Sequence, residues 1–373
     1  MKIAPFGVEI WMNDHETRCR YNLAETCVES LTVDELLTIS GAADSLLDQI
    51  RPMKLTYGPI EGSLRLRTAI TGLYGSLDPG NVIVTHGAVG ANSLVHLALV
   101  ERGDRVVSVV PAYQQHYSIP AAIGADVQIL RLREQDEWLP DLAELKRLAT
   151  PGTKLICFTN PSNPTGSLMD EAYLSRVVEI ARRVDAYVLC DEVYRGTDEA
   201  DPGTTASIVD LYDKGISTAS MSKSFSLAGL RLGWVAGPSE VIEAISIHRD
   251  YNTISVGMIN DLLASLALEN KDAILRRSRE ITRSHRAIVD DWLVGDPRVS
   301  WVRPKSGTTA LLRYDLDLPS RDFCVALLEE TGVLLTPGSA MDMEGYLRLG
   351  YAGNRDELLT GLPLISAFLD RRR

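Results

Sequence analysis

Short apolar segments that alternate with longer helical patterns restrict the fold of this sequence more than any other feature. Strand-like segments rich in β-branched residues lie at 81–86, 104–110, 126–132, 154–160, 186–192 and 215–222. Apolar residues recur at helical spacing between them, in 90–101, 141–149 and 170–184. This alternation is typical of an α/β protein whose mostly parallel sheet is covered by helices on both faces.

The chain changes character after this core. A long helical stretch covers about 241–294, and shorter strands and helices follow it. We therefore expect a large domain at 46–255 and a smaller α+β domain at 256–373. The first 45 residues lack strand–helix alternation, so residues 1–45 are expected to pack with the small domain.

Composition excludes several classes of protein. The 373 residues include 38 Lys and Arg against 50 Asp and Glu, a net charge of −12, which disfavours a nucleic-acid partner. The five cysteines lack metal-ligand spacing, so we expect reduced thiols, no metal site and a cytoplasmic protein. No apolar run approaches the roughly 18 residues of a membrane span, and no membrane partner is expected.

Polar residues gather where the expected strands end. Parallel strands place their carboxyl ends at one edge of the sheet, where α/β proteins bind ligands. The segments concerned are 86–88, 111–113, 160–166, 191–194 and 220–223. Within the last of these, Lys223 stands among serines with no run of carboxylates to pair with. It is either part of a polar loop or a lysine whose amine is held for chemistry.

Three motifs identify a resemblance to a known family. "NPSNPTG" (160–166), "DEVY" (191–194) and "SMSKSFSLAGLRLG" (220–233) follow one another as in class I/II aminotransferases, which use pyridoxal phosphate on a fold-type I scaffold. The resemblance implies a seven-stranded, mostly parallel sheet and a homodimer. It also implies amino transfer between an L-amino acid and a 2-oxo acid.

The resemblance assigns the reacting groups. Lys223 would bond covalently to the cofactor aldehyde and later move the substrate proton, and we expect its amine to deprotonate near neutral pH. Asp191 would keep the pyridine nitrogen protonated. Tyr194 and Asn163 would hydrogen-bond to the phenolic oxygen of the cofactor, and the aromatic ring of Tyr113 would stack on the pyridine.

A phosphate group needs donors and positive charge. Ser220, Ser222 and Arg231 would supply them from one side. The backbone amides of Ala88 and Val89, at the start of a helix, would supply them from the other.

Other residues are implied by their matching positions. Tyr57 would reach the neighbouring subunit's phosphate site, which makes the active site composite, and Arg348 would clamp the substrate α-carboxylate. The N-terminal segment looks like that of the capreomycidine-synthase-like branch, whose members act on arginine derivatives. Glu9 would then bind a cationic side chain, or it belongs to an acidic helix that only packs on the small domain.

Alternative functions share the same core residues. A lyase, cyclase or oxidase acting on a basic amino acid would also use Lys223, Asp191 and Arg348. A non-catalytic domain of a transcription regulator is disfavoured, because such proteins carry a DNA-binding domain ahead of the core, and here a segment of only about 45 residues, acidic in character, precedes it. A dinucleotide-binding dehydrogenase is disfavoured because no GxGxxG follows an early strand.

Overall fold

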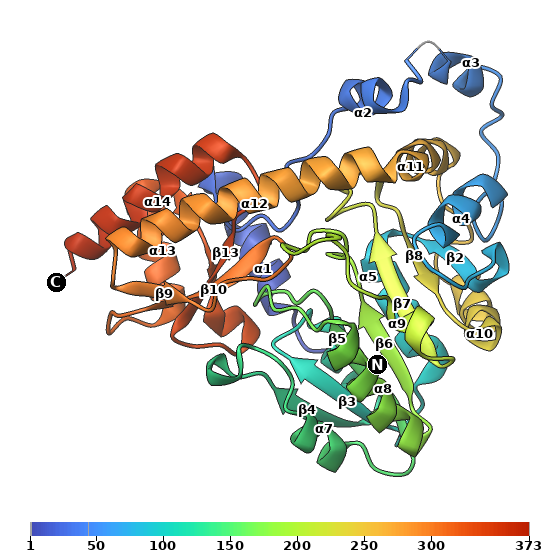
Figure 1. The fold of residues 1–373 in the computed structure, drawn as a ribbon, viewed down its shortest axis with the longest axis horizontal. Coiled ribbons are helices and arrows are strands. Elements are labelled where there is room, and N and C mark those ends of the chain that lie inside the picture. Colours follow the sequence, from blue (N-terminus) through green and yellow to red (C-terminus); the bar gives the residue numbers. More distant parts are fainter. Residues whose placement is uncertain (1, 44, 373) are drawn as a thin grey trace.

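A twisted, mostly parallel sheet forms the centre of the protein in the computed structural model, which describes residues 2–43 and 45–372 (Figure 1). Within these residues the sheet has seven strands in the order β2-β8-β7-β6-β5-β3-β4. Their bounds are β2 Val82–Thr85, β3 Arg105–Val110, β4 Asp126–Arg131, β5 Thr153–Thr159, β6 Tyr187–Asp191, β7 Gly215–Ser220 and β8 Gly233–Ala236. The predicted α/β class is confirmed.

Helices cover both faces of this sheet. One side carries α5 (Gly87–Leu99), α6 (Gln115–Ile123) and α10 (Ser239–Arg249), and the other carries α7 (Leu142–Leu148), α8 (Glu171–Val184) and α9 (Ile208–Leu211). The central strands are buried on both faces, since Leu155 and Ile156 have no exposed surface. Near-continuous apolar strands are what a sheet between two helical layers requires.

Strand β8 was not expected from the sequence. It runs antiparallel to both of its neighbours, β2 and β7. An antiparallel partner needs only a short connection, and the segment 221–232 between β7 and β8 provides it. Because β8 reverses direction between them, β2 and β7 both end at the same edge of the sheet.

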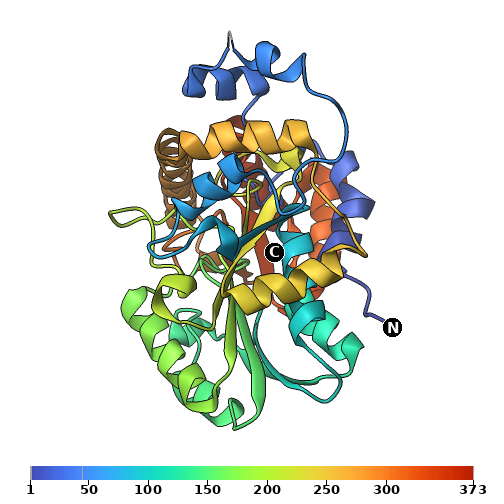
Figure 2. The same cartoon turned by 90° about the vertical axis from the view of Figure 1, so that its right-hand side faces the viewer.

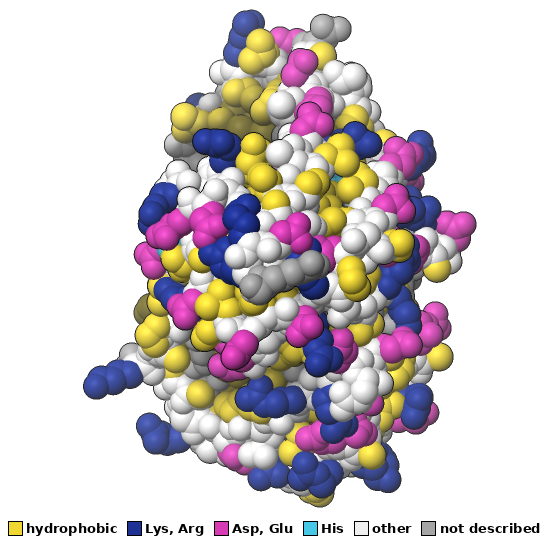
Figure 3. Space-filling model, turned by 90° about the vertical axis from the view of Figure 1, so that its left-hand side faces the viewer, with side chains coloured by type: hydrophobic (Ala, Val, Ile, Leu, Met, Phe, Trp, Pro, Cys, Tyr) yellow, Lys and Arg dark blue, Asp and Glu magenta, His cyan; other side chains and the backbone are white. Residues whose placement is uncertain are grey.

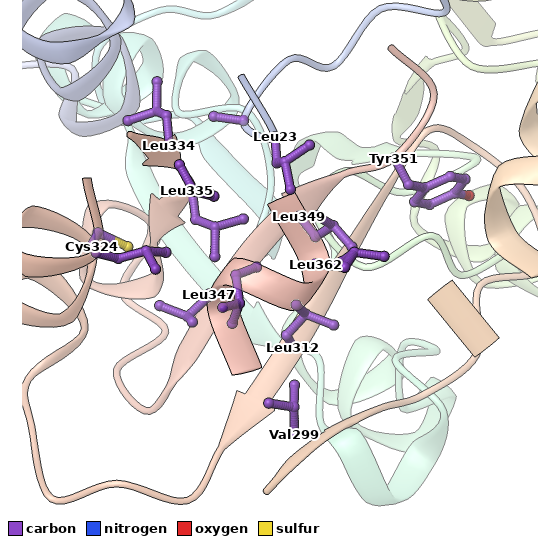
Figure 4. Packing of buried hydrophobic residues seen from close by; sticks show 14 of the residues in the cluster. Leu23, Val299, Leu312, Cys324, Leu334, Leu335, Leu347, Leu349, Tyr351 and Leu362 are labelled. Carbon is purple, nitrogen blue, oxygen red and sulfur yellow. The ribbon is translucent and has the colours of Figure 1, made fainter. Parts of the chain in front are cut away.

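A second, antiparallel sheet lies in the C-terminal part of the chain, with the strand order β12-β13-β10-β9 among the described residues. Its strands are β9 Val299–Trp301, β10 Thr309–Tyr314, β12 Thr336–Pro337 and β13 Tyr346–Gly350. The helices around it are α12 Lys271–Gly295, α13 Ser320–Thr331 and α14 Arg355–Asp370. Figure 4 shows leucines of β10, β13 and α14 packed together in its core.

The N-terminal segment contributes to two different cores. The ring of Trp11 in α1 (Gly7–His15) is fully buried in the C-terminal core and donates from Nε1 to the Leu335 carbonyl at 3.0 Å. Strand β1 (Tyr21–Asn22) pairs with β11 (Val333–Leu334). Farther along, α2 (Val33–Ser40) and α3 (Leu46–Ile50) contribute to another core, with α4 (Leu64–Thr71) and α11 (Met258–Glu269). Figure 2 shows α2 and α3 beyond α11 at one end of the molecule.

The surface mixes both signs of charge. Acidic and basic side chains are interspersed on the face in Figure 3. Among the residues that the structure describes, no helix is both long and apolar enough to span a bilayer, and no three metal-ligating side chains cluster. The five cysteines are free thiols.

Candidate functional site

A cavity of about 780 Å³ opens at the carboxyl ends of the parallel strands. Its walls also include parts of the N-terminal segment and of β13. The predicted residues that line it are Glu9, Ala88, Val89, Tyr113, Asn163, Asp191, Tyr194, Ser220, Ser222, Lys223, Arg231 and Arg348. Tyr57 does not line it; this residue is 73% exposed elsewhere on the surface, and its predicted role in a partner's site stays a prediction.

Strand register explains why Asp191 and Ser220 meet at this cavity. Asp191 is the last residue of β6 and Ser220 the last of β7, and these strands pair in parallel. Lys223 follows three residues after Ser220, in the connection to β8. The polar residues that are scattered along the chain therefore converge on one edge of the sheet.

Asp191 is nearly fully buried, with 4% of its surface exposed, and its carboxylate is held on several sides. Asn92 of α5 donates from Nδ2 to Oδ2 at 2.9 Å, and the Val193 amide donates to Oδ1 at 3.3 Å. The Asn92 amide is fixed in turn by Thr218, whose hydroxyl donates to Oδ1 at 2.6 Å. This network sets the direction of the carboxylate.

A histidine lies directly behind that carboxylate. His116 of α6 is fully buried, with Nε2 3.8 Å from Asp191 Oδ2. Burial alone favours a neutral ring, but the Asp191 carboxylate and Cys157 outweigh it and raise the pKa of His116 to about 9. On its other side, Nδ1 lies 3.4 Å from Nε2 of His96, whose pKa burial lowers well below its ordinary value.

Lys223 projects toward residues that the sequence analysis did not consider. Its Nζ donates to Thr26 Oγ1 at 2.5 Å and lies 3.5 Å from Cys27 Sγ. Burial favours a neutral amine, but Tyr194, Cys27 and Glu25 outweigh it and hold the pKa of Lys223 above its ordinary value. The expectation that the free amine deprotonates near neutral pH is therefore wrong for this arrangement, because phenol, thiol and carboxylate surround it.

Tyr194, Asn163 and Arg348 form a connected group on another wall. Asn163 donates from Nδ2 to the Tyr194 hydroxyl at 3.1 Å, and its Oδ1 lies 3.5 Å from Arg348 Nη1. Arg348 is buried, with 4% of its surface exposed. Its Nη2 donates to Thr336 Oγ1 at 3.1 Å and to the Ala24 carbonyl at 3.3 Å. Its Nε has no hydrogen-bond partner among the described residues. An unpaired buried guanidinium N–H at a cavity indicates a binding site for an anionic group.

A second set of donors surrounds the start of α5. The helix begins at Gly87 with no side-chain cap, so the amides of its first turn are free to bind an anion. Gly87 has φ +65°, and a Cβ there would lie 2.9 Å from Arg231 Nη2. Ser220 and Ser222 are buried beside them, and Arg231 Nη1 lies 3.5 Å from Ser222 Oγ.

The N-terminal segment covers the cavity from the remaining side. Tyr113 donates from its hydroxyl to Glu9 Oε1 at 2.8 Å, and its ring packs against Phe6 with centroids 4.7 Å apart. Glu16 and Glu25 also line the cavity. Burial raises the pKa of Glu16, and the charges of Glu25 and Glu9 add to that effect.

The sequence analysis did not predict the residues that surround the side chains of Asp191 and Lys223. Asn92 and His96 carried a weak signal, because they are polar residues at i, i+4 within an otherwise apolar helix. Thr26, Cys27 and His116 carried none, since only the tertiary structure places them beside Lys223 and Asp191.

A buried carboxylate and a lysine at the strand ends of an α/β sheet, next to an uncapped helix N-terminus, define a class of enzyme that binds a phosphorylated organic cofactor. The model of the family described as aminotransferase class I and II matches residues 33–362. The chain belongs to this family, which confirms the predicted resemblance and the class I/II aminotransferase function.

Individual relatives agree with this assignment. A PLP-dependent aminotransferase from Streptococcus suis superposes with a TM-score of 0.97 at 44% identity, covering 100% of this chain and 99% of that one. The PLP-dependent cyclase OrfR superposes with a TM-score of 0.92 at 27% identity, covering 100% and 99%. Capreomycidine synthase of Streptomyces vinaceus is 29% identical over 363 residues, 96% of this chain and 92% of the relative.

The charge on His116 gives the stability of the site a distinct pH dependence. Because its folded-state pKa is about 9 and its unfolded value about 6.5, its contribution is fully present below about pH 6.5 and is lost as the pH rises through 9. We expect His116→Gln to flatten the decrease in melting temperature of the apoprotein across that window. Thermal unfolding at several pH values measures this, and parallel curves for the two proteins would contradict it.

Proposed function

We propose that this cavity binds pyridoxal 5′-phosphate on Lys223 and that the protein moves an amino group between an L-amino acid and a 2-oxo acid. One observation carries the proposal: Lys223 and Asp191 line the same cavity, with the free amides of α5 and Arg231 on its wall. These features match a compact ligand that has an aldehyde, a ring nitrogen and a phosphate.

The residues present fit that cofactor. The uncapped start of α5 and the absence of a Cβ at Gly87 leave room for a phosphate between helix and guanidinium. Ser220 and Ser222 add hydroxyl donors. The amides of Ala88 and Val89 complete a set of donors that would hold the phosphate without a metal ion.

When bound, the cofactor supplies an electron sink for the negative charge that develops on the substrate Cα. Asp191 would accept a hydrogen bond from the ring nitrogen of the cofactor. Asn92 fixes the orientation of that carboxylate, and the ring of His116 lies behind it, with Nε2 3.8 Å from Oδ2.

Lys223 has two tasks in this proposal. Its amine would hold the cofactor through the aldehyde, and as a free amine it would take the proton from the substrate Cα. The Tyr194 hydroxyl and Asn163 amide, which lie within hydrogen-bond distance of each other, would hold the cofactor's phenolic oxygen. The ring of Tyr113, which lines the same cavity, would pack on the pyridine.

Arg348 orients the substrate. Its buried guanidinium offers parallel N–H donors to the α-carboxylate, which fixes the bond at Cα that faces the cofactor. Arg313, on the neighbouring strand β10, is not needed for this role, because its side chain is 64% exposed and pairs with Glu134 at 3.5 Å.

We also propose a homodimer in which Tyr57 enters the partner's site. Tyr57, Ile60, Ile247 and Tyr251 are large hydrophobic residues with exposed side chains. Gly58 lies beside Met258 at the start of α11, so the segment around Tyr57 packs near this helix. A second copy that covers these residues would bury them and complete the active site.

The proposal includes a division of the chain into an N-terminal segment (1–45), a large domain (46–255) and a small domain (256–373). It also includes a cytoplasmic location. The five free thiols support a reducing compartment. Two separate sheets with their own apolar cores support a division into two domains.

A second candidate is a lyase, cyclase or oxidase acting on a basic amino acid. Glu9, Glu16 and Glu25 line the same cavity as Arg348, so a substrate clamped by its carboxylate would meet negative charge with its side chain. The similarity to capreomycidine synthase and to a PLP-dependent cyclase supports this alternative.

Lys223→Ala is expected to abolish the visible absorption of the bound cofactor and its covalent trapping by borohydride, because the amine that bonds to the aldehyde is gone. Amino transfer should fall at least about 10²-fold, the range for loss of a general base. Lys146→Ala, at an exposed position of α7, serves as the control. If borohydride still fixed the cofactor covalently to the Lys223→Ala protein, the assignment would be disproved.

Arg348→Gln is expected to raise KM for the amino donor about tenfold to a hundredfold, the cost of losing charge-assisted hydrogen bonds. The dissociation constant of pyridoxal phosphate should change little. Arg313→Gln on β10 is the matched control and should keep both values. Equal losses in KM and cofactor affinity would argue against the clamp.

A screen of amino donors distinguishes the two candidate functions. The main proposal predicts formation of 2-oxo acid without free ammonia or peroxide, and the alternative predicts ammonia, peroxide or a cyclised product from a basic donor. Glu9→Gln should then reduce the preference for basic over neutral donors about tenfold, and Asp14→Asn on the same helix should not. An unchanged preference would remove Glu9 from substrate recognition.

A further inference from the structure

We infer that Thr26 is a positioning residue for Lys223: its hydroxyl holds the free lysine amine in one place whenever the amine is not bonded to the cofactor. The inference rests on the proposed function and extends it. It assigns a specific task to the turn formed by residues 24–27, a part of the chain far from the family's motifs.

The hydrogen bond between Lys223 and Thr26 is short and joins two distant parts of the chain. Lys223 Nζ donates to Thr26 Oγ1 at 2.5 Å, and the next acceptor, Cys27 Sγ, lies 3.5 Å away. Among residues 2–43 and 45–372, these two atoms are the acceptors found within hydrogen-bond distance of Nζ. The amine therefore has one strong acceptor, and that acceptor is a hydroxyl.

Several contacts fix the turn that carries this hydroxyl. The Glu25 carboxylate accepts from the amides of Thr26 at 2.6 Å and Cys27 at 2.8 Å. Thr308 donates from its hydroxyl to the Thr26 carbonyl at 2.7 Å. Because Thr26 is β-branched, its χ1 has little freedom on a fixed backbone. The hydroxyl is thus held by the protein before the amine meets it.

The same turn is joined to the substrate clamp. Arg348 donates from Nη2 to the Ala24 carbonyl at 3.3 Å, and a Cβ at Gly350 would lie only 1.7 Å from the Glu25 carbonyl oxygen. Strand β13 therefore positions the clamp at Arg348 and the turn at Thr26 together. One rigid unit sets the distance between the substrate carboxylate and the amine.

Charge supports the same arrangement. Burial raises the pKa of Glu25, but Lys223 and the two amides outweigh it and keep the carboxylate pKa below its ordinary value. The ionised Glu25 stabilises the protonated form of Lys223 and makes the amine a stronger base. A strong base must be aimed, since proton transfer requires a fixed donor–acceptor distance.

Thr26→Val in the holoenzyme tests the inference, because valine keeps the shape and removes the hydroxyl. We expect kcat to fall about tenfold and the isotope effect with a Cα-deuterated amino donor to increase, with KM and the cofactor's visible spectrum unchanged. Thr26→Ser should restore most of kcat. Thr38→Val, at an exposed position of α2, is the matched control.

A second test measures the protonation of the Lys223 amine in the apoprotein and does not depend on enzyme activity. Reductive methylation of Lys223, followed by mass spectrometry across a pH series, reports how readily the amine loses its proton. Thr26→Val should shift the labelling midpoint to lower pH, because the hydrogen bond that stabilises the ammonium is lost. If the valine variant does not fold, Thr26→Ala compared with Thr26→Ser makes the same test.

The outcomes separate this inference from the proposed function. Unchanged kcat, isotope effect and labelling profile in Thr26→Val would overturn the role of Thr26, and so would a serine variant as impaired as the valine variant. Cofactor that borohydride still traps covalently on Lys223→Ala would instead overturn the proposed function itself.

Discussion

The buried carboxylate of Asp191 is the constraint on which the rest of the site depends. A charge with 4% exposure is stable only if the surrounding structure supplies hydrogen bonds or opposite charge. Asn92, the Val193 amide and His116 supply them from α5, the loop after β6, and α6. Three separate elements around β6 therefore converge on one buried carboxylate at the end of a strand.

The cavity is completed by parts of the chain that are distant in sequence. Strand β13 brings Arg348 to the sheet edge, and Gly350 at its end allows the turn around Glu25 to approach closely. The buried ring of Trp11 attaches α1 to the same C-terminal core, so Glu9 reaches the cavity mouth. The groups proposed to hold the cofactor therefore come mainly from the large sheet, whereas Arg348 and Glu9, proposed to meet the substrate, come from β13 and α1.

The motif residues and the N-terminal carboxylates lie on different walls of the cavity. The residues of the three motifs surround the proposed cofactor position, and an aminotransferase and a cyclase could share them. The carboxylates of Glu9, Glu16 and Glu25 belong to the N-terminal segment, outside those motifs. In the proposed function, these carboxylates are the groups that a substrate side chain would meet.

The sequence by itself determined the α/β class, the parallel strands and the motif residues that line the cavity at the strand ends, because strand periodicity and the end of a strand are local features. Strand β8 and helix α6 were not predicted, since the first begins with Gly233 and has a single β-branched residue, and the second contains Pro120 and polar residues in place of a clear apolar stripe. Tertiary structure alone decided that His116 lies behind Asp191 and that Thr26 lies 2.5 Å from Lys223. Such contacts join residues far apart in the chain, and their distances depend on how whole layers pack, which no local pattern records.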